Sequence, residues 1–157
     1  MAPFSSLLSD KKKEEKLRPG AVIYYYCPVT TPPKYKYQVI CNIDPLLVLL
    51  INSRIHEFIP NRPELLRCQV SLKSEDYDFL KYDSHLNCVD AHECYEITNL
   101  KEMVVSNYRE IYKGELLPNS VREVIAAINE STVMAPINKK RITSSLNDFL
   151  NLCSYEF

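Results

Sequence analysis

The amino-acid sequence predicts a single α+β domain, a small and strongly curved antiparallel β-barrel closed off by helices near the C-terminus. Three observations predict this fold class. Five runs rich in β-forming residues, separated by turn residues, lie between residues 20 and 97. Helical periodicity with an apolar stripe appears only from Ser120 onward. The length of 157 residues, with 46% hydrophobic and 25% charged side chains, is typical of one globular domain.

A charged segment at residues 9–17 precedes the predicted barrel. Ser9 or Asp10 can serve there as the N-cap of a short helix. The three lysines at 11–13 could face RNA, but Glu14 and Glu15 follow them directly. This mixture of charges favours a solvent-exposed helix face.

The first three strands are predicted from their composition and from the turns between them. Pro19-Gly20 ends any preceding helix, and the β-forming run at 21–29 follows. Two further runs, at 35–43 and 46–51, are separated by the tight turn Asp44-Pro45. Because the 46–51 run is apolar throughout, we expect that strand to be buried on both faces.

Two more strands are predicted after a turn at residues 61–64. Apolar residues alternate along 65–72, which indicates a half-buried antiparallel strand. Strand character resumes at 85–97. The helical part then begins with Ser120 and Glu123, which have the spacing of a capping box.

The C-terminal part of the chain predicts two helices. Apolar residues recur at helical spacing between 121 and 128, and Pro136 is expected to end that region. A last amphipathic helix is predicted over 138–152. Several strands followed by helices favour an α+β domain rather than alternating βαβ units.

Composition excludes several classes of function. The only two glycines are Gly20 and Gly114, so no glycine-rich phosphate loop can form. The longest apolar run, at 45–51, is far shorter than the roughly 20 residues of a membrane helix. The N-terminus has no sustained apolar stretch of the kind found in secretory signals. We therefore expect a cytoplasmic protein that does not contact a membrane.

The six cysteines are scattered through apolar runs and include no CxxC pair. A domain of this size can bury a full core without a disulfide framework, so buried thiols are the expected interpretation. The net charge is −1, from 19 basic and 20 acidic side chains. Because nucleic-acid binders usually carry a basic excess, any RNA contact must be a local patch or groove.

The order of these segments resembles the MazF/PemK family of toxins from toxin–antitoxin systems. The resemblance covers roughly residues 18–131, with 1–17 as an N-terminal extension and 132–157 as a C-terminal helical extension. Its motifs are RPGAVIYYYCPVT, KYKYQVICNID, LLVLLINS, the run from Cys68 to Ile97, and KGELLPNSVREVIAAINES. The resemblance implies an SH3-like small antiparallel β-barrel with C-terminal helices.

The resemblance also implies an activity, namely metal-independent cleavage of single-stranded RNA by attack of the 2′-hydroxyl on the adjacent phosphate. Such a site needs a base, an acid and a cation for the developing charge, but no cofactor. The matching positions supply candidate catalytic residues Lys36, Ser53, Asp90 and His92. Candidate RNA-binding residues are Thr30, Thr31, Lys34 and Tyr35.

One departure from the family leaves a second hypothesis open. The family's catalytic arginine precedes a proline in the second strand, whereas this chain has Lys34-Tyr35-Lys36-Tyr37. Lysine lacks the planar fork with which arginine binds phosphate. The alternative is therefore a catalytically inactive SH3-like module for protein interactions.

Two groups of residues allow further interpretations. The eleven tyrosines, concentrated on the first two strands, could stack RNA bases, form a dimer face or pack across strands. Cys88, Asp90, His92 and Cys94 alternate with a period of two, which invites a zinc hydrolase as a third, weaker hypothesis. Residues two apart on a strand are roughly 6–7 Å apart, however, which is too far for all four to bind one ion. The expected partners are RNA, a small antitoxin protein and a second copy of the chain in a homodimer.

Overall fold

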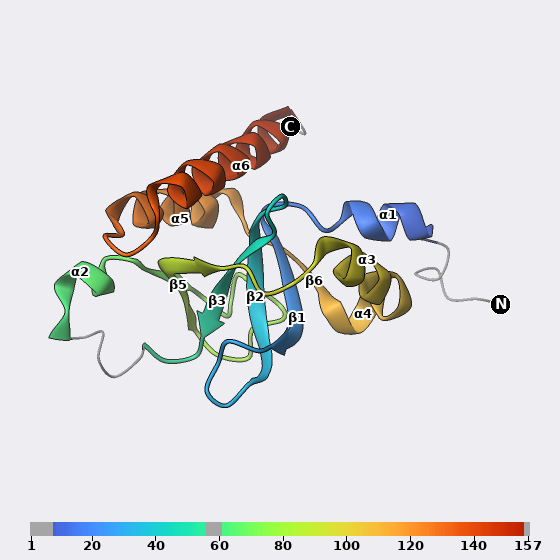
Figure 1. Cartoon of the computed structure of the whole chain (residues 1–157), viewed down its shortest axis with the longest axis horizontal. Coiled ribbons are helices and arrows are strands. Elements are labelled where there is room, and N and C mark those ends of the chain that lie inside the picture. The colour runs from blue at the N-terminus through green and yellow to red at the C-terminus, as the bar shows by residue number, and fades with distance from the viewer. Residues whose placement is uncertain (1–7, 56–60, 156–157) are drawn as a thin grey trace.

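The computed structural model describes residues 8–55 and 61–155, and within these ranges six strands form one antiparallel sheet in the order β4-β5-β3-β2-β1-β6. The sheet curls into a half-barrel, with helices packed on both of its faces (Figure 1). The elements are α1 (Asp10–Glu15), β1 (Ala21–Cys27), β2 (Lys34–Asn42), β3 (Leu47–Asn52), α2 (Pro63–Leu66), β4 (Gln69–Leu72), β5 (Ser84–His92), α3 (Ile97–Ser106), α4 (Tyr108–Ile111), β6 (Tyr112–Glu115), α5 (Pro118–Glu130) and α6 (Pro136–Tyr155).

The two faces of the sheet bury separate cores, because successive side chains on a strand point to opposite faces. On the first face, residues such as Val39, Leu49 and Leu86 pack with α5 and α6. On the second face, Ile40 and Val48 pack with α3, α4 and the chain that follows α1. The prediction that β3 is buried on both faces is confirmed, since its first five residues are all buried. Helices therefore cover much of both faces (Figure 1).

The predicted strand at 65–72 is wrong in its first half. Residues 63–66 form the short helix α2, with Pro63 in its first turn, and only 69–72 pair with β5. Proline favours the first turn of a helix because it has no N–H that needs a partner there. Cys68, Val70 and Leu72 are nevertheless buried on one face, as the alternation predicted.

Two elements after β5 have no counterpart in the sequence prediction. The segment 97–111 forms α3 and α4, and residues 112–115 add β6 at the edge of the sheet, beside β1. The strand predicted to reach residue 97 ends at His92. The sheet is therefore a six-stranded half-barrel rather than a five-stranded barrel.

The C-terminal helices are confirmed, but their caps differ from the prediction. Ser120 lies inside α5, which begins at Pro118 with Leu117 as its N-cap, so the predicted capping box is wrong. Pro136 begins α6 instead of only ending the preceding region. At the N-terminus, Ser9 is confirmed as the N-cap of α1, since its side chain accepts the N–H of Lys12 at 3.2 Å. Of the expected extension 1–17, residues 1–7 lie outside the described part.

The prediction of buried thiols is confirmed for Cys27, Cys41, Cys68 and Cys88, whereas Cys94 and Cys153 are only partly buried. Burial raises the pKa of the Cys41 and Cys88 thiols well above the usual range. Both are therefore held as neutral thiols, which behave as small apolar side chains of the core. In the described part of the chain, no helix is long and apolar enough to cross a membrane.

Candidate functional site

Tyrosines on β1 and β2 form a row of aromatic rings on the first face of the sheet. Tyr24 lies opposite Tyr37, and Tyr26 lies opposite Tyr35, so their side chains share a face. Successive ring centroids are 4.7 to 5.9 Å apart. We call this row the aromatic ladder, in the order Tyr26, Tyr35, Tyr24, Tyr37, Phe79 and Tyr77. Its first three rings are exposed, and its last ring is buried.

A cleft of about 390 Å³ opens beside the exposed part of the ladder. One wall comes from β2 and the end of β3, and the other comes from residues 80–82 of the segment between β4 and β5. The lining combines four tyrosines (Tyr24, Tyr35, Tyr37, Tyr82), three lysines (Lys34, Lys36, Lys81), two serines (Ser53, Ser84) and two aliphatic residues (Ile51, Leu80). No carboxylate is among these residues. The cleft is therefore a local basic and aromatic patch on a chain whose net charge is −1.

The wall at residues 80–82 belongs to a segment that is fixed to the rest of the fold. Near its two ends, Asp83 accepts hydrogen bonds from the N–H and the hydroxyl of Ser74, at 2.8 and 3.1 Å. In its middle, the buried Tyr77 hydroxyl accepts the N–H of Leu117 at 3.0 Å and lies 2.6 Å from the Ser120 hydroxyl. These contacts tie the wall to the N-terminal end of α5.

Lys36 contributes to the cleft, yet its ammonium points elsewhere. It donates a hydrogen bond to the side-chain oxygen of Asn52. Asn52 alternates along β3 with the buried first-face residue Ile51, so the Lys36 ammonium lies on the second face. Burial, and then the neighbouring Lys34 ammonium, lower the pKa of Lys36 from its usual value.

His85 is a candidate that the sequence interpretation missed. In the strand register, His85 on β5 lies directly opposite Asn52 on β3 and opposite Ser71 on β4. Side chains at directly opposed positions have their Cβ atoms about 5 Å apart. A polar row, which consists of Lys36, Asn52, His85 and Ser71, therefore crosses the second face. Only the strand register could identify this row, because its two titratable residues, Lys36 and His85, are 49 positions apart in the sequence.

The cleft and the polar row adjoin one another at one end of the sheet. Consecutive residues lie on the two surfaces at three places, namely Tyr35 and Lys36 on β2, Asn52 at the end of β3 and Ser53 directly after it, and Ser84 and His85 on β5. Consecutive Cα atoms are only about 3.8 Å apart. An extended ligand that crosses this end of the sheet can therefore contact both surfaces.

The structure brings together only part of the predicted site. Lys34, Tyr35, Lys36 and Ser53 all line the cleft. Thr30 and Thr31 lie in the turn between β1 and β2 and do not line it. The hydroxyl of Thr30 is within 3.2 Å of the Cys27 carbonyl and 2.9 Å of the Pro32 carbonyl, so it stabilises the turn.

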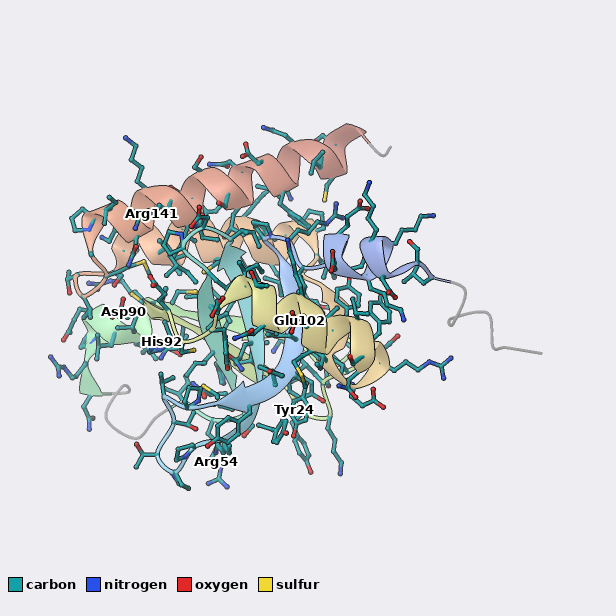
Figure 2. The ribbon with its side chains drawn as sticks, turned by 45° about the vertical axis from the view of Figure 1, so that its right-hand side comes forward. Tyr24, Arg54, Asp90, His92, Glu102 and Arg141 are labelled. Atoms are coloured by element: carbon teal, nitrogen blue, oxygen red, sulfur yellow. The ribbon has the colours of Figure 1, made fainter. Side chains whose placement is uncertain are left out.

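Asp90 and His92 lie away from the other predicted residues. His92 pairs with Val48, which is five residues before Ser53 on β3. Five residues of extended strand span roughly 16 Å. Figure 2 shows Asp90 and His92 near each other and well separated from Tyr24 and from Arg54, the residue after Ser53. These two side chains are therefore not placed to share a proton-transfer step with Lys36.

A bulge in β5 explains why the period-two spacing from Cys88 to Cys94 does not place these four side chains on one face. From the pair Leu50–Asn87 to the pair Val48–His92, β5 advances by five residues while β3 advances by only two. Asp90 accepts the backbone N–H of Ala91 at 2.9 Å within this bulge. The segment is therefore not a regular strand with a constant face. Within residues 8–55 and 61–155, no group of three or more His, Cys, Asp or Glu side chains is placed to hold a metal ion.

Neither the protein-family models nor the curated proteins give a match to this chain. The site is therefore described by its own geometry alone.

Proposed function

We propose that the protein is an endoribonuclease of the MazF/PemK toxin type, on an SH3-like barrel, that cuts single-stranded RNA by 2′-hydroxyl attack without a metal. The observation that carries this proposal is the polar row beside the basic and aromatic cleft. The lysine ammonium hydrogen-bonded to Asn52 and the histidine in register with Asn52 are the two groups that such a reaction uses.

The roles follow from the chemistry of the step. A base takes the proton of the 2′-hydroxyl as its oxygen attacks phosphorus, and an acid protonates the departing 5′-oxygen. Histidine can serve as both, because its side chain exchanges a proton near neutral pH. We assign this role to His85. The Lys36 ammonium stabilises the negative charge of the phosphorane, and Asn52 holds that ammonium in place.

The cleft provides the contacts for the RNA chain. Exposed tyrosine rings stack unpaired bases, and lysines neutralise the phosphates. Lys34 and Lys81 supply this charge in the cleft, and Ser53 can donate a hydrogen bond to a phosphate oxygen. A double helix presents no unstacked bases, so the proposed substrate is single-stranded. The proposal implies a small antitoxin protein as a partner.

The test is a cleavage assay on a labelled single-stranded RNA with the purified protein and two pairs of variants. His85→Gln should lower the rate by roughly 10²- to 10⁴-fold, the usual contribution of a general acid or base, while His92→Gln should retain it. Lys36→Met should lower the rate by roughly 10²- to 10³-fold, while Lys11→Met, in the exposed helix α1, should retain it. Circular dichroism of each variant checks the fold.

Three outcomes separate the hypotheses. Loss of cleavage in His92→Gln but not in His85→Gln would mean that His92, and not His85, transfers the proton. If all four variants cut RNA as fast as the parent, the assignment of Lys36 and His85 to the catalytic site is wrong. If the parent binds single-stranded RNA but does not cut it, the protein is the inactive module instead, and the lysine in place of the family's arginine is the physical reason.

A further inference from the structure

Two exposed tyrosines face the cleft from separate segments of the chain. Tyr35, on β2, is 59% exposed, and Tyr82, in the segment before β5, is 63% exposed. Exposed aromatic side chains that gather in one depression mark a candidate binding surface. The Lys81 ammonium lies 5.8 Å from the centroid of the Tyr82 ring.

The ring of Tyr35 and the backbone at Tyr82 are held in place before any ligand binds. Tyr35 is part of the aromatic ladder, with ring centroids 5.8 and 5.9 Å from those of Tyr24 and Tyr26. Tyr82 directly precedes Asp83, which is hydrogen-bonded to Ser74, and its carbonyl accepts the hydroxyl of Ser84 at 2.9 Å. A base that enters between the two rings therefore binds without the cost of ordering the Tyr35 ring or the Tyr82 backbone.

The cleft offers few groups that could recognise the hydrogen-bonding edge of a base. Its lining contains no Asn, Gln, Asp, Glu or Arg side chain. The Ser84 hydroxyl is used within the fold, and the Lys36 ammonium binds Asn52 on the other face. The remaining polar groups of the lining are single hydroxyls and ammonium groups, which lack the paired donor and acceptor of an amide. Stacking area, which is larger for a purine than for a pyrimidine, is therefore the main basis on which the cleft can discriminate between bases.

We infer that the cleft holds one unpaired purine of a single-stranded RNA between the rings of Tyr35 and Tyr82, with the Lys81 ammonium at an adjoining phosphate. This inference rests on the proposed function, since it takes RNA as the ligand. It adds a preference for the substrate: RNA with an unpaired purine at the bound position is favoured over RNA that consists only of pyrimidines.

The inference is tested by fluorescence anisotropy with labelled short oligomers of adenylate and of uridylate. The parent should bind the adenylate oligomer more tightly. Tyr82→Leu and Tyr35→Leu should each weaken adenylate binding by roughly 5- to 150-fold, the range for stacking of one base, and should reduce the difference between the two oligomers. Tyr82→Phe keeps the ring and should bind like the parent.

The charged contact has its own matched pair of variants. Lys81→Met should weaken the binding of both oligomers and make it less dependent on salt, because one phosphate contact is lost. Lys140→Met, which removes an exposed lysine from α6, should leave both affinities unchanged.

The outcomes distinguish this inference from the proposed function. If the parent cuts RNA but Tyr82→Leu binds adenylate as tightly as the parent, the paired-tyrosine site is wrong and the proposed function stands. Equal affinity of the parent for the two oligomers would overturn the purine preference. If the parent neither binds nor cuts any single-stranded RNA, the proposed function fails, and this inference fails with it.

Discussion

At the scale of single residues, the half-buried Lys36 ammonium is the group on which the proposed chemistry depends most. Burial and the Lys34 charge both disfavour its protonated form, and they lower its pKa. The protonated form is the one that stabilises a phosphorane. Its charge is therefore lost at a lower pH than the charge of an exposed lysine.

This shift predicts the alkaline side of the pH profile. Cleavage by the parent should fall as the pH rises through the pKa of Lys36, which is below the value of about 10.4 for an unperturbed lysine. Lys34→Gln removes a positive neighbour, so it should raise the pKa of Lys36 and move the alkaline fall to higher pH. The measurement is single-turnover cleavage over a range of pH at constant ionic strength. An alkaline fall that does not move in Lys34→Gln would contradict the assigned role.

At the scale of elements, the wall of the cleft depends on the contact between Tyr77 and the start of α5. The Tyr77 side chain is almost fully buried, at 4% exposure, and its hydroxyl contacts both Leu117 and Ser120. Loss of that hydroxyl leaves a backbone N–H and a serine hydroxyl without this partner. The ring contact with Phe79 does not depend on the hydroxyl.

Tyr77→Phe should therefore lower the free energy of unfolding by about 1–3 kcal/mol, the cost of unsatisfied buried polar groups. Tyr82→Phe, which removes an exposed hydroxyl, should change it by less than about 0.5 kcal/mol. Urea denaturation followed by circular dichroism measures both changes. Equal stability of the two variants would mean that the Tyr77 hydroxyl does not fix the wall.

A second contact between elements occurs at Gly20, where the start of β1 meets α6. Gly20 has a φ of 96°, and a Cβ at this position would lie 3.0 Å from two ring carbons of Phe149. Its N–H donates to the Ile40 carbonyl at 2.8 Å, and its carbonyl accepts the N–H of Leu116 at 2.9 Å. Both the backbone conformation and the space therefore favour glycine.

Gly20→Ala should destabilise the fold by more than the roughly 1–3 kcal/mol that a strained backbone conformation costs. Gly114→Ala is the control, because Gly114 also has a positive φ, of 137°, but has open space where the Cβ would lie. Thermal unfolding of the two variants should therefore rank Gly20→Ala as the less stable. If Gly20→Ala loses less thermal stability than Gly114→Ala, the Phe149 ring moves aside freely.

At the scale of the whole molecule, the exposed tyrosines bear on assembly. We predict a homodimer, because the resembled family dimerises through its barrel and adjacent tyrosines offer a self-complementary face. Tyr26 is 47% exposed and belongs to the aromatic ladder but not to the lining of the cleft. Tyr26 is therefore the exposed ladder residue that can contribute to a dimer contact without itself lining the cleft.

Static light scattering at tens of micromolar, a concentration suited to weak association, should give the mass of a dimer for the parent. Tyr26→Ser should shift the mass toward that of a monomer. Val133→Ser is the control, because it alters an exposed residue between α5 and α6. A monomeric parent would contradict the prediction.

The positions of most strands, and the residues that they bury, could be predicted from the amino-acid sequence. Alternating or continuous apolar runs located β1 to β5, and helical periodicity located α5 and α6, because these patterns record burial directly. They did not locate α3 or β6: α3 buries only Leu100 and Val104, and the four residues of β6 are all half-buried. Nor did they reveal the register that places His92 opposite Val48, away from Ser53, or the bulge in β5.

Which polar side chains meet depends on how the strands pair in the folded sheet. The resemblance noted in the sequence suggested Lys36 and Ser53, and the fold does place both at one end of the sheet. It could not select His85 over His92, because the choice depends on the register between β3 and β5. That register is set by packing across strands, and a shift of one residue turns every side chain to the other face. The partners of Lys36 are therefore a property of the folded sheet rather than of any segment of the chain.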